Sequence, residues 1–281
     1  MSFNIRQDTS DDKLNAWPYR KEKAASMLQF HRVDIAGLQE VLINQLQDIS
    51  QYLPEYGWIG VGREDGSGKG EFAPIFYLKE RFEPIKHGTF WLSDTPNKPG
   101  SKGWDAVWPR IVTWGEFKDL LTDKEFYFFN THFAHSENVA KVESAYLLLQ
   151  KVANIACDNP AIITGDFNST ISSEVYQLLT GKKHNRYELE PFRDSRYESE
   201  RGHHGPTITS HKFKATAMFD LIGKLEELRD SSANVECEMR IDYIFIKNSV
   251  KVLQHGVLAD TWNGRYPSDH MPVVADLALG N

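Results

Sequence analysis

The 281-residue chain has few cysteines and no long apolar run. Nothing supports a disulfide between Cys157 and Cys237, so two reduced cysteines in or near the core are the simpler expectation. No stretch is long and apolar enough to cross a bilayer, and none has the form of a secretory signal. These absences argue against a disulfide-stapled domain and against a transmembrane segment. They leave open a cytoplasmic protein or an exported one whose signal has been removed.

The chain also has no excess of positive charge, and it has no internal repeats. Its formal net charge is −7, whereas a broad nucleic-acid-binding surface is usually basic. Nucleic acid is therefore a disfavoured partner, although a local basic cleft on an acidic body is compatible with this charge. Without a repeat or a low-complexity linker, the economical expectation is a single domain over residues 1–281, with no protein partner predicted.

Apolar patterns predict strands and helices in mixed order. The predicted strands cover residues 2–6, 33–38, 58–63, 72–79, 82–93, 110–120, 125–133, 161–166, 241–247, 250–258 and 272–279. The predicted helices cover residues 19–31, 41–53, 137–156 and 173–179, and residues 8–18 and 181–212 are expected to be irregular. Strand-rich ends with interspersed helices favour an α/β fold of two packed sheets with helices on the outer faces.

Short polar clusters stand at the ends of the apolar runs. The six clusters are Phe3-Asn4-Ile5-Arg6, Gly37-Leu38-Gln39-Glu40, Asn130-Thr131-His132, Thr164-Gly165-Asp166-Phe167-Asn168, Arg240-Ile241-Asp242-Tyr243 and Ser268-Asp269-His270. They offer carboxylates, amides and imidazoles but no cysteine nucleophile, which suits a hard divalent cation, an activated water and a phosphate. If these strand ends meet at one rim, the chain is a metal-dependent phosphoesterase.

The cluster after residues 161–164 is the most informative one. Asp166 and Asn168 stand two residues apart, which puts both on one face if the strand continues. Burial raises the pKa of a carboxyl group, and a raised pKa suits a general base for water. An Asx turn is the structural alternative. We favour the functional interpretation.

An acid and an imidazole are adjacent at Asp269 and His270, just before an apolar strand. Asp242, in the predicted strand 241–247, could orient the imidazole of His270, as acids commonly do for catalytic histidines. The alternative is a structural pair at a strand end. Taken together with Asp242, the functional interpretation is again favoured.

Four further candidates have two interpretations each. Glu40 suits Mg²⁺ but also a solvated strand end, and Asn4, an amide in an otherwise apolar strand, suits a site residue or a satisfied core amide. His132 suits a phosphate contact or a satisfied core histidine. Arg110 suits a phosphate clamp or a surface salt bridge.

Several tempting patterns do not carry a function. Residues 62–70 are glycine-rich but do not have the spacing of a P-loop. Three histidines in a polar loop lack zinc-ligand spacing and are expected to be solvated: His203, His204 and His211. Four tryptophans could stack bases at a cleft, but aromatic residues in strands are mostly core: Trp58, Trp91, Trp104 and Trp108.

Taken in order, the six clusters resemble the endonuclease/exonuclease/phosphatase superfamily, which has the DNase I-like fold. The resemblance covers nearly the whole chain, and its most specific parts are Gly165-Asp166-Phe167-Asn168 and Ser268-Asp269-His270. The cluster at residues 130–132 looks most like the branch with the carbon-catabolite-repressor-type deadenylases and the sphingomyelinases. Residues 88–93 also look like bacterial members of undefined substrate.

The resemblance implies a four-layer α/β sandwich of two mixed sheets flanked by helices, with the active site at one rim. It implies Mg²⁺ (or Mn²⁺) on Glu40, with Asn4 and Asp269 close by. Two departures from the family pattern are visible. Ala134 stands where related chains often carry an acid, and Ile208 follows Thr207 where an aromatic residue is usual.

The same resemblance implies the catalytic roles. Asp166 would be the general base and Asn168 its positioning partner. His270, held by Asp242, would stabilise the pentavalent phosphorus, and His132 would also act in catalysis. The phosphate-binding residues implied are Arg110, His132, Asn168 and His270.

The sequence thus predicts a Mg²⁺-dependent phosphodiester hydrolase and leaves its substrate open. A small phosphodiester, a sugar or inositol phosphate, and nucleic acid are all compatible with the site. One alternative is a 3′-5′ RNA exonuclease of the deadenylase type, which would want a basic groove with stacking aromatic residues. Another alternative is a catalytically inactive phosphate-binding module, which predicts the loss of a chemistry residue. None is missing from the sequence.

Overall fold

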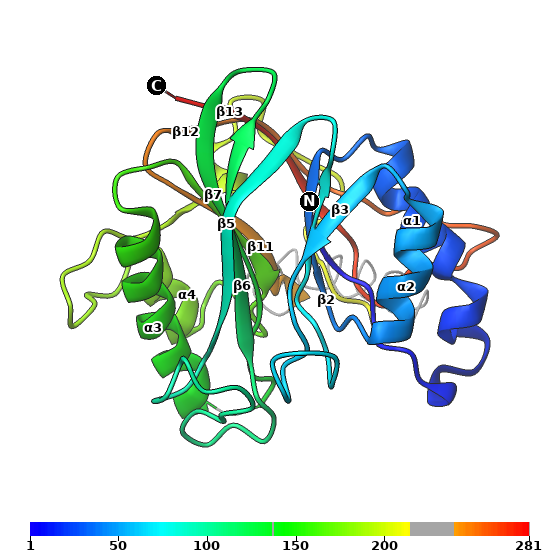
Figure 1. The fold of residues 1–281 in the computed structure, drawn as a ribbon, viewed down its shortest axis with the longest axis horizontal. Coiled ribbons are helices and arrows are strands. Elements are labelled where there is room, and N and C mark those ends of the chain that lie inside the picture. Colours follow the sequence, from blue (N-terminus) through cyan, green and yellow to red (C-terminus); the bar gives the residue numbers. More distant parts are fainter. Residues whose placement is uncertain (137, 214–238, 281) are drawn as a thin grey trace, which may run out of the picture.

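Two mixed β-sheets pack face to face at the centre of the molecule (Figure 1). The computed structural model describes residues 1–136, 138–213 and 239–280. The first sheet has the order β10 (His203–His204), β12 (Val250–Val257), β13 (Val273–Leu279), β1 (Ser2–Asn4), β2 (Ile35–Gln39), β4 (Ile75–Leu78) and β3 (Tyr56–Ile59). The second has the order β5 (Phe82–Trp91), β6 (Ile111–Asp119), β7 (Lys124–His132), β8 (Ala161–Asp166), β11 (Asp242–Lys247) and β9 (Arg193–Asp194).

Helices cover the outer face of each sheet, as Figure 1 shows. Helices α1 (Lys21–Phe30) and α2 (Ile43–Tyr52) pack their apolar side chains on β1 and β2 of the first sheet. Helices α3 (Asn138–Ala156) and α4 (Glu174–Leu179) do the same on β7, β8 and β11 of the second sheet. The short helix α5 (Ser195–Glu198) lies by β11 and β12. The predicted four-layer sandwich is therefore confirmed.

Strands β7 and β8 have unbroken runs of apolar residues because successive side chains alternate between two covered faces of the sheet. In β7, Phe126 and Phe128 point to the interior between the sheets, while Phe129 points to α3. In β8, Ile162 and Ile163 divide in the same way. Both faces of these strands are covered, so both sets of side chains are apolar.

Near one rim the interior between the sheets becomes polar. Asn130 donates from Nδ2 to the carbonyl oxygens of Leu38 at 2.7 Å and Pro74 at 2.9 Å, and its Oδ1 accepts from Gln39 Nε2 at 2.7 Å. A Cβ atom added to Gly37 would lie 2.1 Å from Thr164 Oγ1 of the opposite sheet, so only glycine permits this approach. The two sheets are thus fixed against each other directly behind the rim.

Strand direction brings the polar clusters to that same rim. Strands β1 and β2 are parallel, and so are β7 and β8, where His132 pairs with Asp166. Strand β11 is antiparallel to β8 and pairs Asp242 with Asp166, while β13 is antiparallel to β1. The ends of four strands and the starts of two others therefore meet at one place.

Three details differ from the sequence-based expectations. Residues 8–18, expected to be a loop, contain two 3₁₀ turns, Ser10–Asn15 and Trp17–Tyr19, because Trp17 is buried under α1 and α2. The region 181–212 contains β9, α5 and β10. Cys157 is a free thiol on the surface rather than in the core, and Cys237 lies outside the described residues.

Candidate active site

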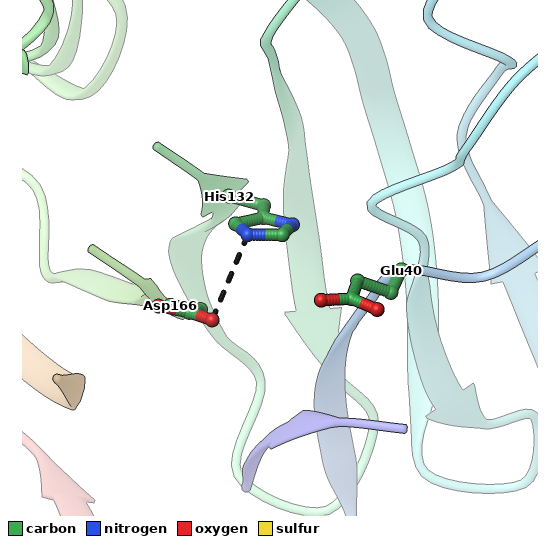
Figure 2. A group of neighbouring side chains, drawn as sticks. All are labelled: Glu40, His132 and Asp166. Atoms are coloured by element: carbon green, nitrogen blue, oxygen red, sulfur yellow. Dashed lines mark ion pairs between the residues drawn. The ribbon is translucent and has the colours of Figure 1, made fainter. Parts of the chain in front are cut away.

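Three side chains from different strand ends face one another at the rim. Glu40 follows β2, His132 ends β7 and Asp166 ends β8, and Figure 2 shows the three together. Their possible ligand atoms all lie within 4.8 Å of one another. His132 Nε2 is 3.6 Å from Asp166 Oδ2. A second group of this kind, Asp166 with Asp242 and His270, shares Asp166.

Asn4, at the end of β1, holds the two carboxylates together. Its Nδ2 donates to Glu40 Oε1 at 3.0 Å and to Asp166 Oδ2 at 2.9 Å. Its Oδ1 accepts from the Arg6 amide at 2.9 Å, and the Gln7 amide donates to Glu40 Oε2 at 3.0 Å. The amide nitrogen rather than the amide oxygen of Asn4 therefore faces the carboxylates, which fixes their orientation.

Asn168 links Asp166 to His132. Its backbone N–H donates to Asp166 Oδ1 at 2.9 Å, which is the Asx turn foreseen as an alternative, and its φ of 45° is left-handed. Its Nδ2 donates to the Phe133 carbonyl at 3.1 Å and lies 3.0 Å from His132 Nε2. Since Asn168 donates there, His132 Nε2 accepts and its Nδ1 carries the proton. The same residue therefore closes the Asx turn on Asp166 and contacts His132 in the site.

His270 and Asp242 form a buried pair beside Asp166. His270 Nδ1 lies 2.9 Å from Asp242 Oδ2, and its Nε2 lies 3.8 Å from Asp166 Oδ2. Burial alone would lower the pKa of His270, but Asp242 and then Asp166 outweigh burial and raise it well above its usual value. Asp242 is held in turn by its backbone N–H, which donates to Thr209 Oγ1 at 3.1 Å. The imidazole is therefore a cation with Nε2–H facing the rim.

Burial shifts the two other titrating groups at the centre in opposite directions. Burial, followed by the charge of Asp242, raises the pKa of Asp166. Burial, followed by the guanidinium groups of Arg110 and Arg63, lowers the pKa of His132 well below its usual value. Asp166 is thus suited to accept a proton near neutral pH, and His132 is a neutral imidazole.

These groups line one side of a cleft of about 660 Å³. The cleft also carries three guanidinium groups, from Arg6, Arg63 and Arg110. Arg110 lines the cleft, and its Nη1 is buried without a hydrogen-bond partner among the described residues, so the guanidinium group is the one of the three that could pair with an anion through its accessible atoms. Asp269 also lines the cleft, and burial and the charge of Glu40 raise its pKa although His270 lowers it.

The structure brings all nine sequence-derived candidates to this rim. They are Asn4, Glu40, Arg110, His132, Asp166, Asn168, Asp242, Asp269 and His270. Sequence reasoning missed Arg63 and Glu71, whose Nη1 and Oε2 atoms are 2.6 Å apart. Glu71 Oε2 lies 3.8 Å from His132 Nδ1. The isolated strand bridge of Phe72 with Val41 brings Glu71 beside Glu40, and no sequence spacing signals that bridge.

Comparison with known proteins identifies the family. The model of the Endonuclease/Exonuclease/phosphatase family matches residues 1–270. The chain belongs to this family. Family members are enzymes that hydrolyse phosphate esters, and this chain is one of them. The inactive-module hypothesis is therefore set aside.

Two solved bacterial structures of the family are similar over the full chain. An endonuclease/exonuclease/phosphatase from Bacteroides vulgatus is 39% identical, with a TM-score of 0.85, over 99% of this chain and 97% of that one. A mannosyl-6-phosphatase from Bacteroides thetaiotaomicron is 37% identical, with a TM-score of 0.84, over 99% of this chain and 98% of that one.

A third relative is a longer protein, and this chain matches only part of its length. The 3′-5′-exoribonuclease subunit of the Saccharomyces cerevisiae CCR4-Not complex is 23% identical over 92% of this chain. The chain spans only 35% of that protein.

Every helix within the described ranges is too short or too polar to cross a bilayer.

Proposed function

We propose that this protein is a Mg²⁺-dependent phosphoesterase whose natural substrate is a small phosphate ester. One observation carries the proposal. Asn4 ties Glu40 to Asp166, and His270, charged by Asp242, lies 3.8 Å from that same Asp166. A metal-ligand carboxylate, a base and a cationic donor thus converge on one point in the cleft.

The donor set suits a hard divalent cation. Mg²⁺ prefers oxygen ligands and keeps several waters, and Mn²⁺ accepts the same ligands. Glu40 would hold the ion, with Asp269 and Asn4 close by, and the ion would withdraw electrons from the phosphoryl oxygens. Asp269 lies outside the two groups of described ligand atoms that come within 4.8 Å of one another, which makes Glu40 the better anchor.

The chain's own residues would carry the proton and hold the phosphate. Asp166 would take a proton from a water positioned by Asn168, and the water oxygen would bond to phosphorus while the bond to the leaving oxygen breaks. The leaving oxygen would take its proton from solvent. Nε2–H of His270 and the guanidinium group of Arg110 would donate to the phosphoryl oxygens. His132 would orient Asn168 through Nε2 and reach the phosphate only from Nδ1.

A sugar phosphate is the substrate class that the comparisons favour. The relative called a mannosyl-6-phosphatase is 37% identical over nearly the whole of both chains. A 3′-5′ RNA exonuclease is the second candidate, since the yeast exoribonuclease subunit is related over most of this chain. The net charge of −7 favours the small ester.

The test is an assay of three substrates with and without Mg²⁺: mannose 6-phosphate, bis-p-nitrophenyl phosphate and single-stranded RNA. We expect Mg²⁺-dependent release of phosphate from mannose 6-phosphate, lost in Glu40→Gln. Hydrolysis that survives EDTA, or that Glu40→Gln retains in full, contradicts the proposal. Cleavage of RNA alone replaces the small ester with the second candidate.

A further inference from the structure

We infer that Trp108, beside the Arg63–Glu71 ion pair, is a stacking platform for the sugar ring of the leaving group. The substrate would then be a carbohydrate phosphate. This inference rests on the proposed function, since it assigns the part of the substrate that leaves the phosphate.

Trp108 is an exposed indole at the mouth of the cleft. It is 54% exposed although it is a large aromatic residue, and it lines the same cleft as the reacting groups. The cations of Arg63 and Lys102 each lie 5.8 Å from its ring centroid. Its loop is anchored to α3, because Asp105 Oδ1 accepts from the Ala140 backbone N–H at 2.7 Å. The ring is therefore held in place while it remains open to a ligand.

A continuous set of contacts leads from Trp108 to the reacting centre. Arg63 faces the indole ring and pairs with Glu71 at 2.6 Å. Glu71 Oε2 lies 3.8 Å from His132 Nδ1, and His132 Nε2 lies 3.6 Å from Asp166. A phosphate held at His132 and Arg110 would thus place its ester group toward the Arg63–Glu71 pair and Trp108.

The polar groups on this side of the cleft suit a ring with several hydroxyl groups. The hydroxyl hydrogens can donate to Glu71 and to the exposed Glu64, and the hydroxyl oxygens can accept from the guanidinium group of Arg63, because all three residues line the cleft. The C–H face of a pyranose carries partial positive charge, which complements the negative face of an indole ring. Polar groups beside one aromatic face form the usual pattern of a small-molecule site.

The same wall is less suited to a nucleic-acid strand. Glu64 is an exposed carboxylate in the cleft lining, and it would repel a phosphodiester backbone. Binding single strands without base pairing usually takes successive aromatic platforms. Trp108 and Phe213 are the aromatic residues that line the cleft in the described part of the chain, and Phe213 faces the Arg20 guanidinium at 5.7 Å.

The test compares a ring-bearing ester with a ringless one. Steady-state kinetics on mannose 6-phosphate and glycerol 3-phosphate would be measured for wild type, Trp108→Ala and Trp108→Phe. Trp58→Ala is the matched control, since Trp58 is also exposed, at 37%, but lies on β3 outside the cleft lining. We expect Trp108→Ala to raise KM for mannose 6-phosphate about tenfold with kcat little changed. The Trp108→Phe variant should recover most of that loss, while glycerol 3-phosphate and the control stay within twofold.

Several results would overturn the inference and leave the proposed function standing. One is an equal loss on both esters, and another is no loss on either. With single-stranded RNA assayed beside the two esters, a loss confined to RNA would show base stacking instead. If wild type hydrolyses neither ester but does hydrolyse bis-p-nitrophenyl phosphate with Mg²⁺, the inference fails alone. If it hydrolyses none of the three, the proposed function fails as well.

Discussion

A buried pair of histidines makes a quantitative prediction about stability and pH. His255 on β12 is 2% exposed, and its Nδ1 lies 3.0 Å from Nδ1 of His203 on β10. His203 Nε2 donates to the Pro206 carbonyl at 2.9 Å, so His203 Nδ1 accepts and His255 Nδ1–H donates. In this arrangement each ring carries one N–H and is neutral. A proton added to His203 would go on Nδ1 and set two N–H groups against each other, whereas one added to His255 would go on Nε2, which is buried without a hydrogen-bond partner among the described residues.

The size of the effect follows from the pKa of His255. Burial, followed by the charge of Arg240, lowers that pKa to about 3. Because the folded pKa is below the unfolded value of about 6.5, the contribution to stability is full above pH 6.5 and is lost as the pH falls toward 3. At pH 5 the unfolded histidine binds a proton that the folded one does not, which costs about 2 kcal/mol.

Urea unfolding of wild type and His255→Phe at pH 7 and pH 5 measures this term. The phenylalanine variant does not titrate, so its stability deficit should shrink by about 2 kcal/mol between pH 7 and pH 5. His184→Gln is the control, because His184 is exposed. Its replacement should change the free energy of unfolding by the same amount at pH 7 and at pH 5. A deficit that is the same at both pH values, or larger at pH 5, would refute the assignment of neutral rings.

Three further substitutions test the packing of the two sheets, a buried ion pair and the orientation of His270. Gly37→Ala should destabilise the fold by about 1–3 kcal/mol in urea unfolding, because the new Cβ would lie 2.1 Å from a side-chain oxygen of the opposite sheet; an unchanged midpoint would contradict this. Arg240→Met should cost about 3–5 kcal/mol in the same assay, because it leaves Asp194, 2.7 Å away and buried, without its cation; a cost under about 1 kcal/mol would show the pair to be dispensable. Asp242→Asn should lower phosphoester turnover by roughly a hundredfold or more with the fold intact by circular dichroism, because it removes the charge that keeps His270 protonated; turnover near wild type would exclude that role.

Local pattern was enough to predict the elements of the fold. Residues 161–163 carry apolar side chains on both faces and Asp166 ends the run, so the strand could be placed residue for residue. The side chain of Ser173 caps α4, which a serine before an apolar helical run indicates. The rim was predictable from the six polar clusters taken together, because one polar strand end such as Glu40 can simply be solvated, whereas six with complementary chemistry indicate a site.

Contacts that depend on tertiary packing could not be predicted. His211 and His203 were expected to be solvated, and that was wrong, because His211 packs on Tyr266 and His203 pairs with a histidine that lies 52 positions away in sequence. Trp108 was expected to be core like other aromatic residues, yet it is exposed because its loop ends at the mouth of the cleft. Glu71 follows a glycine-rich loop, and only the packing of that loop brings it to the site.

The central claim is that Asp166 accepts the proton of the attacking water in a Mg²⁺-dependent hydrolysis. The most direct measurement is the turnover of Asp166→Asn on mannose 6-phosphate, together with a Mg²⁺ titration of the same variant. We expect a loss of roughly 10²–10⁴-fold in kcat with Mg²⁺ still bound, because the amide keeps the shape of the carboxyl group but cannot take the proton. Turnover within a fewfold of wild type would contradict the account.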